Sequence, residues 1–252
     1  MISVDPAGAP PAKVAPGGRA ARSAARAPDR GRHASVELLV GTGLVALVAA
    51  VGAYFAFRPA SGSVDGWILT LVTGSNSPWF TDATSLRYPL VVVIGSVLVA
   101  AATFPRDRPR AVACLVGPPL ALVLCELAAK PLVGRTLGGV LSYPSGSTVG
   151  AAALATAAVI ATPARWRLVG VVVGTVYALW MAVAVVALRW HYPTDALAGL
   201  AFGVGIVLII DGAAWKAAAS MPLRAGRSPE VASDVEAAEA LGGGGPPPAP
   251  PR

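Results

Sequence analysis

Two side chains that can act together on a substrate lie one helical turn apart in the segment His191-Tyr-Pro-Thr-Asp195. Pro193 suits the first turn of a helix, where the N–H that proline lacks would have no partner. Asp195 can then accept a hydrogen bond from one ring nitrogen of His191, which leaves the other nitrogen free and more basic, as in an oriented nucleophile. The alternative is a polar helix start that places Asp195 near the positive end of the helix.

The segment Pro144-Ser145-Gly146-Ser147-Thr148 combines a turn with the start of a helix. Backbone N–H groups and hydroxyls at such a start form an arrangement that binds anions. Serine and threonine are also ordinary N-cap residues, so this segment alone is weak evidence. Ser145, Gly146 and Ser147 are the anion-binding candidates of the turn.

Cations near these segments strengthen the case for an anion site. Lys130 and Arg135 lie at the two ends of a Lys-Pro-Leu-Val-Gly-Arg loop, and Arg189 lies two residues before His191. Such side chains can hold phosphate oxygens, although lysine and arginine also commonly reach a membrane interface without a ligand. Glu126 lies one turn before Lys130 and is expected to pair with it, and a catalytic role for this carboxylate stays open.

Six apolar stretches must position these residues. The chain is 55% hydrophobic and 13% charged, and its mean hydropathy is +0.64, which is typical of integral membrane proteins. Each stretch is near the ~20 residues that a helix needs to cross a bilayer, whereas barrel strands are shorter and alternate in polarity. We therefore expect an all-α fold, an integral membrane six-helix bundle with spans at about 36–57, 88–104, 111–129, 146–162, 168–188 and 194–215.

Two tails flank this membrane domain, which is expected to cover residues 35–216. Residues 1–34 are rich in Pro, Ala, Gly and Arg and predict a disordered basic tail. Residues 217–252 contain a glycine run and a proline run and predict a second disordered tail.

The distribution of Lys and Arg predicts the orientation. Fifteen of these residues lie in the tails and loops of one side, and five lie on the other side. The positive-inside rule then places both termini in the cytoplasm. The polar residues Lys130, Arg135, Arg189, His191 and Asp195 then lie on the outer side. Three lysines against seventeen arginines, with abundant alanine, indicate a high-GC bacterial source and hence the bacterial cytoplasmic membrane. Residues 58–87 form the longest outer connection, in which the apolar segment 64–73 predicts a short interfacial helix, an ordinary loop or a lid over the site.

Several classes of site are excluded by the remaining sequence. Cys114 and Cys125 lie in one apolar stretch, so they are expected to be buried thiols and not a disulfide framework. Two distant histidines and two apolar cysteines provide no cluster of metal ligands, and no cofactor is expected. The net charge of +7 follows from the tails and loops and does not indicate a nucleic-acid partner.

In their order and spacing, the three polar segments resemble the type 2 phosphatidic acid phosphatase family of membrane lipid phosphatases. That family's signature is a Lys-to-Arg-Pro segment, then Pro-Ser-Gly-His, then Ser-Arg followed by His and Asp. The resemblance covers roughly residues 40–215. It is specific because the three segments occur together, whereas no single segment is specific. It implies metal-independent hydrolysis, in which His191 attacks phosphorus and becomes phosphorylated, Asp195 orients it, and Lys130 binds phosphate together with the turn at Ser145.

This chain departs from the signature at three places. Ser147 stands where the family has the histidine that protonates the leaving group, and the only other histidine lies in the expected N-terminal tail. Leu137-Gly138 replaces the first Arg-Pro pair, and Ala184-Val185 replaces the Ser-Arg pair. Arg135 and Arg189 are near enough in sequence to stand in for the lost arginines.

Loss of the general acid affects the expected substrate. A positioned acid contributes ~10²–10⁴ in rate, and it matters most for a basic alkoxide leaving group and least for a phosphate, whose second pKa is roughly 6. We therefore expect hydrolysis of a lipid or polyprenyl pyrophosphate, with lipid phosphate monoesters as the alternative substrate. Two other interpretations stay open: a non-catalytic relative that binds lipid phosphate or a membrane partner, and a small transporter or scaffold, against which the lack of a polar path through the spans argues.

Overall fold

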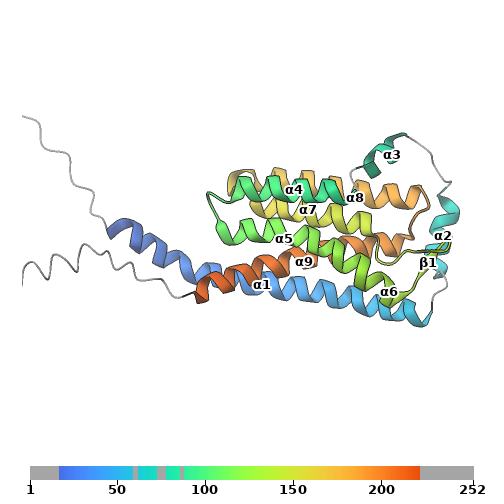
Figure 1. Cartoon of the computed structure of the whole chain (residues 1–252), viewed down its shortest axis with the longest axis horizontal. Helices are drawn as coiled ribbons and strands as arrows, with labels where there is room; N and C mark the ends of the chain where they lie inside the picture. The colour runs from blue at the N-terminus through green and yellow to red at the C-terminus, as the bar shows by residue number, and fades with distance from the viewer. Residues whose placement is uncertain (1–16, 59–61, 73–77, 86–87, 222–252) are drawn as a thin grey trace, which may run out of the picture. The chain divides into compact units, whose positions relative to one another are not determined.

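The computed structural model describes residues 17–58, 62–72, 78–85 and 88–221 (Figure 1). Residues 1–218 form one compact unit, whose fold is given below, and only three residues of the second unit, 219–252, are described. The elements in chain order are α1 (Gly17–Phe57), α2 (Ser63–Leu71), α3 (Pro78–Ser85), α4 (Pro89–Thr103), α5 (Arg108–Leu124), the π-helical turn η1 (Cys125–Ala129), α6 (Lys130–Val133), the antiparallel strands β1 (Thr136–Leu137) and β2 (Val140–Leu141), α7 (Gly146–Ala161), the 3₁₀ turn η2 (Ala164–Trp166), α8 (Arg167–Ala187) and α9 (Pro193–Ser220).

Long apolar helices make up most of this fold, as the composition predicts. Within the described part of the chain, four segments are long and apolar enough to cross a membrane: Gly31–Phe57, Arg108–Val133, Ala164–Ala187 and Pro193–Ser220. The apolar helices α4 and α7 have 15 and 16 residues, fewer than the ~20 that a full crossing requires. Four of the six expected spans therefore meet the length criterion, and the short helices α2, α3 and α6 raise the number of helices above the expected six.

The expected N-terminal tail overlaps a helix. Helix α1 begins at Gly17, so the structure describes residues 17–34, which the sequence assigned to the disordered tail, as helical. Alanine and arginine are good helix formers, and extending an existing helix avoids the cost of nucleation. Ala34 is already buried against α9. Residues 1–16 and 222–252, which hold most of the expected tails, lie outside the described residues.

The expectation for the cysteines is confirmed, because Cys114 and Cys125 are buried free thiols. The connection between α1 and α4 contains the short helices α2 and α3, which carry Trp67 and Trp79 with 62% and 72% of their surface exposed. Exposed tryptophans are typical of segments that lie at a membrane interface.

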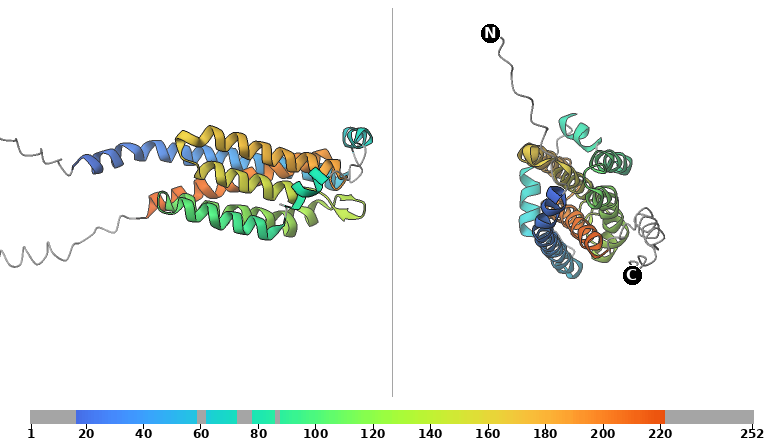
Figure 2. Two further views of the ribbon diagram at one scale, coloured as in Figure 1. Left: turned by 90° about the horizontal axis from the view of Figure 1, so that it is seen from above. Right: turned by 90° about the vertical axis from the view of Figure 1, so that its left-hand side faces the viewer.

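Helix α7 lies in the middle of the bundle, and Figure 2 shows its neighbours side by side around it. It packs against α4, α5 and α8, and nine of its 16 residues are buried. Its residues are mostly alanine and glycine, because lipid supplies little hydrophobic drive for association and small side chains let helix backbones approach closely. The residues at its N-terminal end are thereby fixed from several sides.

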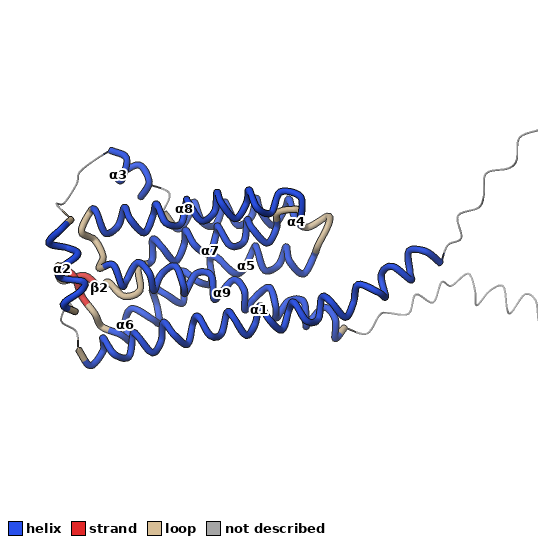
Figure 3. Tube along the Cα trace, turned by 180° about the vertical axis from the view of Figure 1, so that it is seen from behind, coloured by secondary structure: helices blue, strands red, loops and turns tan. Residues whose placement is uncertain are grey.

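Glycines bring α9 close to α1 and to α7, and Figure 3 shows α9 between these two helices. A β-carbon at Gly203 of α9 would lie 2.5 Å from the backbone oxygen of Val149 in α7. A β-carbon at Gly41 of α1 would lie 2.7 Å from the backbone oxygen of Gly205 in α9. Neither position has room for a side chain without movement of a helix backbone.

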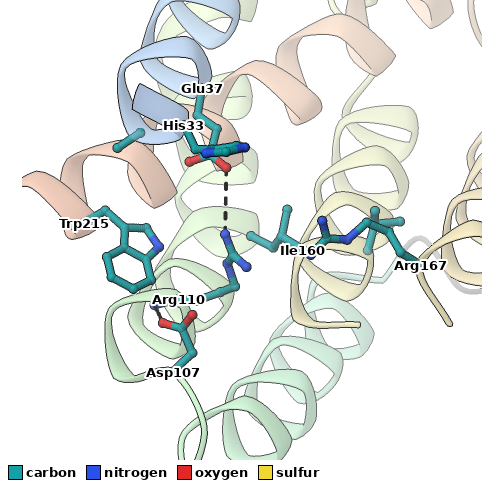
Figure 4. A pocket seen from close by; sticks show the side chains of 9 residues that line it. His33, Glu37, Asp107, Arg110, Ile160, Arg167 and Trp215 are labelled. Atoms are coloured by element: carbon teal, nitrogen blue, oxygen red, sulfur yellow. Dashed lines mark hydrogen bonds and ion pairs between the residues drawn. The ribbon is translucent and has the colours of Figure 1, made fainter. Parts of the chain in front are cut away.

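The two ends of the bundle differ in their polar groups. The start of α1 and the last turns of α9 lie at one end, and α2, α6 and the β1–β2 hairpin lie at the other (Figure 1). At the first end, Arg110 of α5 donates to Asp211 of α9 at 3.2 and 3.3 Å and lies 3.8 Å from Glu37 of α1. Arg110 and Glu37 border a cavity of about 320 Å³ that is also lined by Asp107 and Arg167 (Figure 4). The contacts of Arg110 with Glu37 and Asp211 connect α5 to α1 and α9.

The close approach of α1 to α9 gives a first prediction. Gly41→Ala should lower the stability of the folded protein by about 1–3 kcal/mol, because the new methyl group meets backbone atoms of Gly205 and Ile209 that cannot move without the helix. Gly43→Ala is the matched control, since no described atom lies within 4 Å of its β-carbon position. Thermal unfolding in detergent measures both variants. Equal melting temperatures for the two would contradict the packing described here.

Candidate active site

Five of the candidate residues line one cavity at the end of the bundle that carries α6 and the hairpin. The cavity has a volume of about 1040 Å³ and is lined by the candidates Lys130, Gly146, Ser147, Arg189 and His191. Glu126 lies there as well. The juxtaposition of Lys130, the Pro-Ser-Gly turn and His191 that the motif order predicts is therefore present. Most of the remaining wall is apolar and includes Leu122, Val123, Leu127, Val140 and Leu141.

His191 lies in the loop between α8 and α9, and its side chain is 12% exposed. Its Nδ1 lies 2.9 Å from the backbone oxygen of Ser142. A carbonyl oxygen only accepts hydrogen bonds, so Nδ1 carries a proton, and in the neutral ring this tautomer leaves the lone pair on Nε2. The sequence assigned this orienting contact to Asp195, but the Asp195 Oδ2 is 3.9 Å from Nδ1. The imidazole is thus oriented by backbone and not by the carboxylate expected for it.

Asp195 is fully buried and has other partners. Its Oδ2 accepts from the backbone N–H of Tyr192 at 3.0 Å, and its Oδ1 accepts from Arg135 Nη1 at 2.6 Å. The backbone oxygen of Asp195 also accepts from the N–H of Ser145 at 3.0 Å. Asp195 therefore connects the loop of His191 to the Pro-Ser-Gly turn, which makes it a positioning residue.

Arg135 has a different role from the phosphate contact expected for it. The residue is fully buried, and its Nη2 lies 2.6 Å from Asp65 while Nη1 contacts Asp195 and Thr194. Its guanidinium carbon lies 3.7 Å from the centre of the Phe55 ring, and a second aromatic ring flanks it at 4.2 Å. Two carboxylates and two rings leave the guanidinium no path to a ligand in the cavity.

Asp65 is the member of this network that the sequence analysis missed. It lies in α2 and is 2% exposed, and it accepts from the backbone N–H of Thr194 at 3.1 Å and from the Thr194 hydroxyl at 2.6 Å. The network holds α2 against the start of α9. One signal was available: Asp65 is the only acidic residue in the apolar segment 64–73, where a charge is costly unless it is paired.

The Pro-Ser-Gly turn presents the start of α7 to the cavity. Ser145 is the N-cap residue and is fully buried, and its hydroxyl has no partner among the described residues. No described side chain caps the helix, and the first N–H groups of a helix have no acceptor within it. Gly146 and Ser147 line the cavity at this point. The positive end of α7 therefore faces the same space as His191.

Tyr143 holds the turn from behind. Its hydroxyl donates to the backbone oxygen of Val48 at 2.8 Å, and its ring packs edge-on against Phe55. Burial raises the pKa of Tyr143 above its usual value, so the phenol stays neutral and acts as a hydrogen-bond donor. The turn is thus anchored to α1.

Arg189 contributes to the cavity wall but binds to α2. Its Nη2 lies 2.7 Å from the backbone oxygen of Leu69 and 3.1 Å from that of Val72, and its Nε lies 3.3 Å from Val72. A cation at the C-terminal carbonyls of a helix stabilises that helix end. The phosphate contact expected for Arg189 would compete with these bonds, so its present role is to hold α2 beside the cavity.

Lys130 pairs with Glu126, as its position one turn later predicts. The distances from Lys130 Nζ to the two carboxylate oxygens are 2.8 and 2.9 Å, and the Glu126 side chain is 48% exposed. Leu137 lines the cavity, and Val185 is fully buried in α8. The family that this chain resembles has an arginine at each of these two positions. The present chain has an apolar side chain at both.

The contrast between Arg135 and Lys130 gives a second prediction. Arg135→Met should cost about 3–5 kcal/mol of stability, because it leaves the carboxylates of Asp65 and Asp195 buried without their cation. Lys130→Met should cost only ~0–1 kcal/mol, because it breaks a pair whose partner is half exposed. Thermal unfolding in detergent compares the two. If Arg135→Met is stable but no longer binds phosphate, Arg135 is a phosphate ligand and not a structural residue.

Comparison with known proteins agrees with this geometry. The model of the PAP2 superfamily matches residues 86–217, more than half of the chain and the part that carries the cavity motifs. Among solved structures, the fold is similar to that of the first transmembrane PAP2 type phosphatidylglycerolphosphate phosphatase from Bacillus subtilis, with a TM-score of 0.56 and 18% identity over 71% of this chain and 98% of that one. No curated protein sequence matches the chain. The chain is therefore an integral membrane protein that belongs to the PAP2 superfamily.

Proposed function

We propose that this protein is a membrane phosphatase that cleaves a lipid or polyprenyl diphosphate through a phosphohistidine intermediate. The observation that carries the proposal is the cavity in which the Nδ1 of His191 is held by a carbonyl while Lys130 and the start of α7 line the same space. Membership of the PAP2 superfamily supports phosphate chemistry. The similar structure, described as a phosphatidylglycerolphosphate phosphatase, supports a lipid substrate.

The chemistry is a two-step displacement at phosphorus. Lys130 and the N–H groups at the start of α7 bind the phosphate oxygens. Nε2 of His191 attacks phosphorus, and the bond to the leaving oxygen breaks with its electron pair on that oxygen. A water molecule then attacks the phosphohistidine and releases inorganic phosphate, which restores neutral His191. The carbonyl of Ser142 accepts from Nδ1 and stabilises the positive charge that develops on the ring.

The leaving group decides between the two substrate types. Ser147 lines the cavity where the family's signature has its acid, and a serine hydroxyl is too weak an acid to protonate an alkoxide. A diphosphate needs less help, since its leaving phosphate is weakly basic. The site therefore favours diphosphates over lipid phosphate monoesters. The apolar walls suit the lipid end of either substrate.

We infer that the cavity faces outward in a bacterial cytoplasmic membrane. Five arginines lie in the α4–α5 and α7–α8 connections and in the first turns of α5 and α8, at the end of the bundle away from His191: Arg106, Arg108, Arg110, Arg165 and Arg167. The excess of cations at that end supports a cytoplasmic location for both termini. Diphosphate hydrolysis would then take place at the outer leaflet.

One observation favours a second candidate, a non-catalytic relative that binds lipid phosphate or a membrane partner. Leu137 and Val185 place apolar side chains where the family signature has arginines, which removes two cations from phosphate binding. Lys130 remains as a phosphate ligand in this case too. The two candidates differ in turnover and not in binding.

A third prediction tests the nucleophile. His191→Ala should lower phosphate release from a polyprenyl diphosphate by about 10⁴-fold or more, and it should abolish trapping of radiolabelled phosphate on the protein. His33→Ala is the control, because His33 lies at the other end of the bundle and should behave like the wild type. Wild-type protein that binds phosphate without any turnover would establish the non-catalytic candidate instead.

A fourth prediction tests the missing acid. Ser147→His should raise kcat on a lipid phosphate monoester by about 10²-fold, because it places an imidazole where the leaving oxygen departs. The effect on a diphosphate should be much smaller. Ser147→Ala is the control for the loss of the hydroxyl. Equal gains on both substrates, or equal wild-type rates on both, would refute the leaving-group argument.

A further inference from the structure

The position of Glu126 is not explained by the proposed mechanism. Glu126 lies in η1, the π-helical turn in which the N–H of Lys130 donates to the carbonyl of Cys125. Such turns insert an extra residue into an α-helix and often occur at functional sites. Here the turn leaves Glu126 and Lys130 both on the wall of the cavity.

The Glu126 carboxylate lies where an anion is most strongly attracted. Both of its oxygens are within 2.9 Å of Lys130 Nζ. Its Oε1 also lies against Gly146, the first residue of α7, so closely that a β-carbon there would collide with it. The carboxylate therefore touches the cation and the positive helix end that the mechanism assigns to phosphate.

We propose that Glu126 is a specificity-determining residue, whose carboxylate occupies the phosphate position of the ligand-free site and must be displaced by substrate. The inference rests on the proposed function, because it concerns the same cavity. The side chain is 48% exposed and can swing away when a stronger anion arrives. The carboxylate and the substrate phosphate compete for Lys130.

This competition selects ligands by charge. The phosphodiester of an ordinary bilayer lipid carries one negative charge, which equals that of the carboxylate. A terminal phosphate carries about 1.5–2 negative charges at neutral pH, and a terminal diphosphate carries more. Only the latter groups gain enough at Lys130 to displace Glu126. A site that opens to lipids would otherwise be filled by the abundant phosphodiesters around it.

The test is Glu126→Gln, which keeps the shape of the side chain and removes its charge. Titration with inorganic phosphate in detergent should show about fivefold tighter binding than in the wild type, as expected for loss of one partly exposed ion pair. The KM for the diphosphate substrate should fall while kcat stays within twofold. Phosphatidylglycerol, a phosphodiester lipid, should become a stronger competitive inhibitor in mixed micelles.

Asp82→Asn is the matched control, because Asp82 is exposed on α3 and does not line the cavity, and it should leave all three quantities unchanged. If the wild type binds phosphate and Glu126→Gln binds it equally well or more weakly, the inference about Glu126 is wrong, while the proposed function still stands. A selective loss of kcat on monoesters would do the same, because it would make Glu126 a proton donor. Absence of phosphate binding in both proteins overturns the proposed function as well. Thermal unfolding checks that the variants are folded. If Glu126→Gln does not fold, the same measurements are made on Glu126→Ala.

Discussion

A guanidinium group buried between two carboxylates holds the polar end of this bundle together. Removing these three charges from water is costly, and the cost is offset only if all of them are paired at close range. Arg135 meets Asp65 and Asp195 at 2.6 Å each, and aromatic rings cover its faces. The network joins the short helix α2, the loop before β1 and the start of α9. Because every charge in it is needed for pairing, Arg135 is unavailable to a ligand.

The orientation of the imidazole follows from this network. Asp195 is held by Arg135 and by the N–H of Tyr192, so it does not reach the ring of His191. The carbonyl of Ser142 takes its place, and in the neutral ring this contact leaves the lone pair on Nε2. In the same way, Arg189 donates its hydrogen bonds to the end of α2 and not to a ligand in the cavity. Lys130 and the start of α7 remain as the candidate anion-binding groups.

Membership of the PAP2 superfamily is compatible with a site that has lost several polar groups. The bundle still brings an imidazole, a cation and a helix N-terminus into one cavity. Where the family signature has an acid and two arginines, this chain has Ser147, Leu137 and Val185. The proposed diphosphate substrate would compensate for both losses, since a weakly basic leaving group needs less protonation and a higher charge binds the remaining cation more strongly.

The sequence by itself determined the membrane class, the approximate helices and the three segments that meet in the cavity. Apolar run length, Pro-Gly turns and an i, i+4 pair such as Glu126 with Lys130 are local properties, so they can be read along the chain. Only the tertiary structure decided the partners. Arg135 and Asp65 are 70 residues apart, and which acceptor a buried cation or ring nitrogen meets depends on how helices pack. The contact between α1 and α9 is a tertiary feature too, since Ala34 and Gly41 meet Gly212 and Gly205 across about 170 residues of sequence.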